Sequence, residues 1–335
     1  MTSLAVDVAR VQITKTELQR GADAAARAGI SGIDISRSEA ARRAQLTAKA
    51  NLAEGQEIAL KTAQDVEYWK WDLARASGVQ LFGSARDDAN AVRVVARRIA
   101  ARDSAVQLHF AQLVGFSRFD VEAEAIVMRV SPISVDEDVL ATANPFLSGM
   151  PKGTLASPNN PHNSPDYAGD TSNPRQSPHK VDGLPLNTGE ALTFDSIDGD
   201  ARHDPNLAYY NPDGQLNSMG YNTAGSEHGI ADMRAPINAL VGVFLSNERP
   251  DKTAAPKKLD FSSNASRDFD ELRPQLKQLF FIGDGLNSRG GQQQFIVPEG
   301  ATRLYLATWD FYEWNNNAGS RKVRVNRPGK IITVK

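Results

Sequence analysis

The sequence predicts an α+β protein, in which a long N-terminal helix with a small sheet precedes an all-β domain. Three observations lead to this prediction. Apolar residues in the first 29 positions recur at the three- and four-residue spacings of a helix. Between residues 66 and 129, short runs rich in β-branched and aromatic residues have the character of strands. From about Val181 onward, many short apolar runs are separated by turns that contain Gly, Asp or Asn.

Length and composition limit the classes of protein to consider. A chain of 335 residues can form two domains, each with its own core. The net charge of −2 creates no general attraction for nucleic acid, and no nucleic-acid-binding module is recognisable. The chain has no cysteine, which excludes disulfides, thiol catalysis and cysteine-ligated zinc. No apolar run approaches the roughly 18 residues that a membrane-spanning helix needs.

The first predicted helix covers residues 4–29. Its apolar stripe consists of Leu4, Val8, Val11, Leu18, Ala22 and Ala25. Lys15 interrupts the stripe, although its aliphatic stem can still lie along the seam. The stripe is about three heptads long and contains a lysine. It is therefore compatible with ordinary core packing as well as with a coiled-coil contact between helices.

A second helix and three strands complete the first predicted domain, residues 1–130. The pattern Ser36-Arg-Ser-Glu39 is a capping box that starts a helix ending near residue 53. The clearest strands are residues 66–71, 91–96 and 120–129. In the last of these, apolar residues alternate with acidic ones, so one face of the strand is expected to be buried.

Residues 131–180 are predicted to connect the two domains. Seven of the 17 prolines lie between residues 144 and 180, among Asn, Ser, Gly and Asp. This composition is typical of an extended linker. An ordered connection is the alternative, because Phe146, Leu147 and Tyr167 could dock on a domain.

Residues 181–335 are predicted to form a β-sandwich or jelly roll. The candidate strands are residues 191–194, 239–245, 279–282, 294–297, 302–309 and 321–325. A short helical turn is expected within residues 266–278.

An oxygen-rich turn separates the last two predicted strands. It contains the carboxylates Asp310 and Glu313 and three consecutive asparagines, residues 315–317. Hard oxygen donors on one short turn are the ligands that Ca²⁺ prefers. Asn and Gly are also typical of a plain hairpin turn, which remains the alternative.

Other patterns do not predict a catalytic site, and no enzyme activity is expected. The carboxylates Asp195, Asp198, Asp200 and Asp204 lack the spacing of an EF-hand, so a solvated loop is favoured over a second ion site. The five histidines show no zinc-binding spacing. A hydrolase that acts on envelope polysaccharide is a distant alternative.

The N-terminal run LAVDVARVQITKTELQRGADAAARAG, residues 4–29, resembles the TadE/TadG-like proteins of Flp/Tad pilus assembly. In that family an apolar membrane helix leads into a segment of this kind, and no such helix precedes Leu4 in this sequence. The resemblance therefore implies a pilin-like helix with a small sheet, placed in the cell envelope or outside the cell. It also implies membrane anchoring by an upstream helix and contacts with other pilus or envelope proteins through the N-terminal helix.

The C-terminal part is similar to the bacterial galactophilic lectins of PA-IL type. The similarity is strongest in FIVPEGATRLYLATWD, residues 295–310, and NNAGS, residues 316–320. It implies a galactose-binding-like sandwich with one calcium ion held by an Asp, two consecutive Asn and two backbone carbonyls. Carried over to this chain, the ligands are Asp310, Asn316, Asn317, the carbonyl of Tyr312 or Glu313, and a carbonyl near His203.

The same similarity implies a carbohydrate partner of galactose type. The sugar would contact Asp310, Asn316, Asn317 and His228. Trp314 could pack against the sugar or, equally, belong to the core. These resemblances predict a pilus-assembly protein with a calcium-dependent sugar-binding domain; a structural component whose lectin-like domain no longer binds sugar is the alternative.

Overall fold

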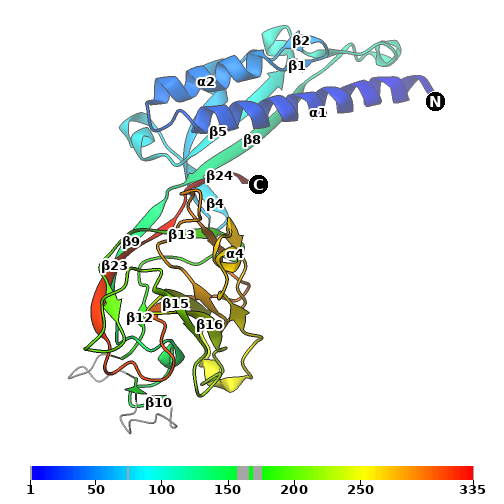
Figure 1. Cartoon of the computed structure of the whole chain (residues 1–335). Helices are drawn as coiled ribbons and strands as arrows, with labels where there is room; N and C mark the ends of the chain where they lie inside the picture. Colours follow the sequence, from blue (N-terminus) through cyan, green and yellow to red (C-terminus); the bar gives the residue numbers. More distant parts are fainter. Residues whose placement is uncertain (1, 74, 157–165, 169–175, 335) are drawn as a thin grey trace. The chain divides into compact units, whose positions relative to one another are not determined.

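A computed structural model describes residues 2–73, 75–156, 166–168 and 176–334. The chain forms two compact units (Figure 1). Unit 1 comprises Met1–Ser131 together with Gly329–Lys335, and unit 2 comprises Pro132–Pro328. Unit 1 combines helices with a sheet, and unit 2 is built mostly of strands. The predicted α+β class is therefore confirmed.

Unit 1 packs two helices on a five-stranded antiparallel sheet. The helices are α1 (Thr2–Ile30) and α2 (Arg37–Lys49). The sheet has the order β24-β8-β5-β3-β4, formed by Lys330–Val334, Val121–Val130, Ala91–Arg98, Val66–Asp72 and Ser77–Gln80. Alanines at positions 22, 25, 40 and 44 are fully buried, so the two helices approach closely. Ser36 caps α2 as predicted, because its hydroxyl accepts a hydrogen bond from the Glu39 backbone N–H at 3.0 Å.

The burial of α1 and the end of α2 differ from the sequence prediction. The stripe on α1 is fully buried from Leu18 onward, whereas Leu4 and Val8 are exposed, because the beginning of α1 extends past the sheet (Figure 1). Helix α2 ends at Lys49 rather than near residue 53. The following residues form a hairpin of β1 (Leu52–Ala53) and β2 (Gln56–Glu57), whose turn has positive φ at Glu54 and Gly55.

Unit 2 encloses its main hydrophobic core between two sheets. One sheet has the order β12-β22-β17-β20, formed by His179–Lys180, Arg303–Thr308, Leu240–Leu245 and Leu279–Phe281. The other has the order β14-β23-β13-β21-β19, formed by Ala201–Arg202, Ala318–Arg327, Ala191–Asp198, Gln294–Ile296 and Glu271–Leu272. Phe280 and Phe295 join the two layers, with ring centroids 5.3 Å apart.

Smaller elements complete unit 2. A third sheet contains β15 (Gln215–Gly220), β16 (Met233–Ile237) and β18 (Leu259–Asp260). The helical turn expected at residues 266–278 lies earlier in the chain: α4 covers Asn264–Arg267 and begins with a capping box at Ser263.

The first predicted domain, residues 1–130, ends next to the observed boundary at Ser131, whereas the predicted connection and the predicted domain 181–335 differ from the structure. Residues assigned to the connection belong to unit 2: β9 (Ile133–Leu140) pairs along the whole of its length with β23, and Phe146 and Leu147 are buried. The predicted connection includes residues 157–165 and 169–175, which lie outside the described residues. The last strand, β24, pairs with β8 of unit 1 rather than with any strand of unit 2. Unit 2 is therefore an insertion between two neighbouring strands of the unit 1 sheet.

Candidate functional site

The oxygen-rich turn spans residues 309–317 and connects β22 with β23. These two strands belong to different sheets, so the segment crosses the end of the sandwich and is not the hairpin expected from its Asn-Gly composition. The segment is called the crossover loop below. Side chains on such a loop are presented at the rim of both sheets, which suits a binding site.

Backbone contacts fix the crossover loop at both ends. The carbonyl of Trp309 accepts a hydrogen bond from the Asn238 N–H at 2.8 Å, and the carbonyl of Phe311 accepts one from the Thr223 N–H at 2.7 Å. At the other end, the side-chain amide of Asn317 donates to the carbonyl of Ala141 at 3.0 Å. The loop is therefore attached to three separate segments of unit 2.

Trp314 is the core residue among the candidates. Its side chain is fully buried, and its indole N–H donates to the carbonyl of Thr308 at 2.7 Å. The ring meets Phe146 edge to face, with centroids 6.0 Å apart. Of the two roles left open by the sequence, the structure supports core packing; the prediction that this ring stacks on a sugar is corrected, because no face of it is accessible.

The oxygens of the crossover loop are directed inward. Asp310, Glu313 and Asn317 are buried, and the Asp310 carboxylate accepts the Phe311 N–H at 2.5 Å. Asn316 uses its side-chain amide N–H to bond Glu313. The amide oxygens of Asn316 and Asn317 are buried, and neither has a hydrogen-bond partner among the described residues. Two adjacent buried acceptors without donors are costly unless a further group binds them.

Buried polar atoms without a partner gather around this end of unit 2. Among the residues that the structure describes, they also include Arg202 Nε, Asn238 Oδ1, Trp309 Nε1 and Arg321 Nε. Each lies in or next to a segment that contacts the crossover loop. Three of these atoms are N–H donors, which a cation cannot satisfy, so ordered water fits them better; Asn238 Oδ1 is the one acceptor among the four.

Two histidines were predicted to take part in the site. His203 is partly buried, and its Nδ1 lies 2.9 Å from the side-chain nitrogen of Asn238, a neighbour of the crossover loop. Burial lowers the pKa of His203, although the adjacent Asp204 opposes this effect. His228 has positive φ, and its Nε2 lies 2.8 Å from the carbonyl of Leu155. The structure thus brings His203 to the loop and attaches His228 to another segment.

Negative charge accumulates near Tyr312. Burial raises the pKa of the Tyr312 hydroxyl. The carboxylates of Glu313, Asp310 and Asp204 raise this pKa further, which places Asp204 on the same side of the molecule as the crossover loop. Proximity of the 203–204 segment to the loop is what the predicted ligand set requires.

The predicted calcium ligands offer amide and carbonyl oxygens more than carboxylates. Within the described ranges, no group of three or more Asp, Glu or His side chains is arranged to hold a metal. The predicted ligands Asp310, Asn316, Asn317 and the carbonyls of Tyr312 and His203 supply only one carboxylate. Such a set corresponds to weak calcium binding of the extracellular kind.

Arg321 and Asn238 were missed by the sequence reasoning. Arg321 is 1% exposed and donates to the carbonyls of Asn238, Asn211 and Tyr210 at 2.6, 3.2 and 3.3 Å. Burial lowers its pKa to about 10. The only signal for Asn238 was its place between two apolar runs, which is typical of a turn, and it adopts φ of 68° there. Together the two residues join β23 to the turns that support the crossover loop.

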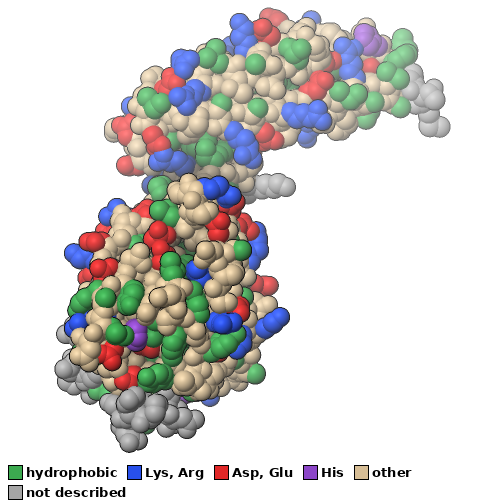
Figure 2. All heavy atoms as spheres, in the orientation of Figure 1, with side chains coloured by type: hydrophobic (Ala, Val, Ile, Leu, Met, Phe, Trp, Pro, Cys, Tyr) green, Lys and Arg blue, Asp and Glu red, His purple; other side chains and the backbone are tan. Residues whose placement is uncertain are grey.

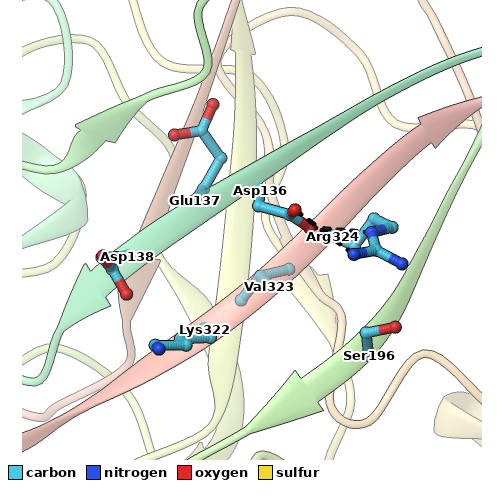
Figure 3. Close-up of a pocket in the computed structure, with 7 residues that line it drawn as sticks. All are labelled: Asp136, Glu137, Asp138, Ser196, Lys322, Val323 and Arg324. Carbon is cyan, nitrogen blue, oxygen red and sulfur yellow. Dashed lines mark hydrogen bonds and ion pairs between the residues drawn. The ribbon is translucent and has the colours of Figure 1, made fainter.

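A separate hollow of about 340 Å³ lies over β9 and β23 (Figure 3). Its charged side chains are partly paired, since Arg324 bonds Asp136 at 2.7 Å. Figure 3 shows Glu137 directed away from Asp136 and Asp138, and Glu137 pairs with His179. The hollow is an exposed sheet face and contains none of the predicted site residues.

One comparison with known proteins identifies a relationship for unit 1. Residues 18–126 match the profile of a family described as "Putative Tad-like Flp pilus-assembly". No curated protein matches the chain. In the part of the chain that the structure describes, no helix combines the length and the apolar character needed to cross a bilayer. The matched segment covers about a third of the chain and lies entirely within unit 1, so it is unit 1 that is similar to the Tad-like pilus-assembly family.

Proposed function

We propose that this chain is a cell-envelope component of Tad-type pilus assembly, in which unit 2 carries a calcium-dependent binding loop. The family match in unit 1 supports a role with other pilus proteins. Unit 2 is inserted between β8 and β24, so both of its connections start from the sheet of unit 1. This insertion supports a role in which unit 1 carries unit 2.

The observation that carries the calcium proposal is the pair of buried amide oxygens on Asn316 and Asn317. Together with Asp310 and the carbonyls of Tyr312 and His203, they would hold the ion. Bound calcium would supply a positive centre that stiffens the loop and leaves coordination positions for the hydroxyls of a ligand. An affinity of about 10⁻⁴–10⁻³ M is expected for a site with so little formal charge.

The proposed ligand is a carbohydrate of galactose type, whose vicinal hydroxyls would replace two calcium-bound waters. Asn316 is partly buried and would contact the sugar directly, whereas the predicted contacts of Asp310 and Asn317 would have to act through the ion, because both side chains are buried. With Trp314 in the core, the apolar face of the sugar would have to rest on another side chain.

Calorimetry of the full chain tests the ion. With Kd near 1 mM, 10 mM Ca²⁺ should stabilise unit 2 by about 1.4 kcal/mol relative to chelator. This gain corresponds to roughly 3–6 °C for a unit of this size. Asp310→Asn and Asn317→Leu should abolish the gain. The matched control Asp198→Asn changes an exposed carboxylate of β13 and should retain it. No calcium-dependent shift in the parent chain would remove the proposal.

A glycan array with and without chelator separates the two candidate functions. Calcium-dependent binding to a galactose-type glycan supports the lectin function. Calcium stabilisation without binding to any sugar supports the structural alternative, in which the ion only stiffens the loop. The burial of Trp314 is the observation that favours this alternative.

A complementation experiment tests the role in assembly independently of calcium. Cells that lack the chain should lose surface pili, and the parent chain should restore them. Asp310→Asn should also restore pili if unit 2 serves binding rather than assembly. Normal piliation without the chain would exclude the assembly role.

A further inference from the structure

One end of unit 1 exposes a cluster of large apolar side chains. It is formed by the beginning of α1, residues 4–13, and by the hairpin of residues 106–119, and is called the tip below. The hairpin contains β6 (Val106–Gln107), η3 (Ala111–Val114) and β7 (Arg118–Phe119). The exposed members are Leu4, Val6, Val8, Ile13, Phe110, Leu113, Val114, Phe116 and Phe119. Figure 2 shows hydrophobic side chains on the end of unit 1 where α1 begins.

The hairpin holds its apolar residues outward in a defined conformation. The buried carboxylate of Asp7 on α1 accepts the backbone N–H groups of His109, Phe110 and Ala111 at 2.9, 2.8 and 2.8 Å. Gly115, with φ of 95°, turns the chain back, and the Phe116 N–H donates to the carbonyl of Ala111 at 3.0 Å.

The side chains at the turn of this hairpin are among the most exposed apolar groups of the described chain. Leu113 is 87% exposed, Phe116 66% and Val114 65%. Alternate residues Val106 and Leu108 are buried, so the hairpin already has a core-facing side. The exposed residues are an additional apolar surface that unit 1 does not use.

The charge of the tip is positive, in contrast to the chain as a whole. Residues 105–119 contain no Asp or Glu but include His109 and Arg118. In residues 1–16 the single carboxylate is Asp7, which is buried, whereas Arg10 and Lys15 are also present. Arg10 pairs with Glu54, which leaves Arg118 as the available cation of the tip and Lys15 as an exposed cation just beyond it on α1.

We propose that the tip inserts into the interfacial region of an anionic lipid bilayer. Apolar side chains that project from a turn, with cations beside them, match the apolar and anionic layers of such a membrane. The proposal concerns the tip of unit 1 and does not depend on calcium binding by unit 2.

Vesicle sedimentation of the full chain tests the proposal. The chain should sediment with vesicles of phosphatidylglycerol and phosphatidylcholine, and less with phosphatidylcholine alone. Raising the salt concentration should weaken binding, because part of the attraction is between exposed charges. Leu113→Gln and Phe116→Ser should each lower the partition coefficient at least about tenfold, since each removes a large apolar group from the interface.

Phe82→Ser is the matched control. Phe82 is 64% exposed, but it follows the edge strand β4 and is not part of the tip. Its substitution should leave binding unchanged, and thermal unfolding should be unchanged in all three variants. Absence of binding to anionic vesicles, or an equal loss in Phe82→Ser, would overturn the proposal. Loss of self-association in Phe116→Ser without any lipid binding would instead identify the tip as a contact between copies of this chain.

Discussion

Substitution of Trp314 by Phe distinguishes a core residue from a ligand-binding residue. The change removes the indole N–H that bonds the Thr308 carbonyl at 2.7 Å. Leaving that buried carbonyl with one donor fewer costs about 1–3 kcal/mol. The smaller ring in a fully buried site adds roughly 1 kcal/mol through imperfect packing against Phe146. The total is about 2–4 kcal/mol, which lowers the Tm of unit 2 by roughly 4–15 °C.

Scanning calorimetry in the presence of chelator measures this effect without any contribution from calcium. Tyr209→Phe is the control, because Tyr209 is half exposed and its ring lies over Arg202 at the surface. This change should move the Tm by little. A Tm for Trp314→Phe within about 1 °C of the parent would refute the core assignment. Such a result, combined with lost sugar binding, would restore Trp314 to the binding surface.

Three further predictions concern other parts of the chain. Burial would raise the pKa of Asp7, but three backbone N–H donors lower it below the ordinary value. The ionised carboxylate therefore stabilises the folded state above about pH 4, and this contribution is lost as the pH falls through the lower pKa of the folded state. Hydrogen exchange of residues 109–111 should show this loss, and Asp7→Asn should remove the pH dependence. Burial and the charge of Asp284 raise the pKa of Asp213, so Asp213→Asn should increase the Tm of unit 2 at neutral pH but not near pH 3. Deletion of residues 329–335 removes an edge strand whose side chains are mostly exposed; calorimetry should show a loss of about 1–3 kcal/mol in the transition of unit 1 alone.

The elements that the sequence predicted well have strong local signals. The capping residue Ser36, the alternation in β8 and the apolar runs of β17 and β22 each specify a helix start or a strand within a few residues. The register of β9 and β24 could not be predicted in the same way. Both strands pair with segments far away in the sequence, and long-range pairing leaves no local pattern.

For the candidate site, the sequence indicated which residue types are present, but not whether their side chains face the core or the solvent. The concentration of oxygen donors at residues 310–317 was visible in the sequence. Whether Trp314 faces solvent or core depends on β22 and β23 lying in different sheets, which composition does not encode. The contacts that support the loop from Arg321 and Asn238 likewise arise only when the segments meet.

The insertion of unit 2 has a consequence for the order of folding. Thr333 pairs with Val127, so closing this sheet in an unfolded chain means joining residues about 200 positions apart. Ile133 pairs with Arg327, however, so a folded unit 2 brings its own two ends together and shortens the effective loop to a few residues. The entropic cost of adding β24 then falls by roughly 3 kcal/mol. Nascent chains should therefore keep the free edge of β8 open until the inserted unit has formed, and β24 should be the last strand to join.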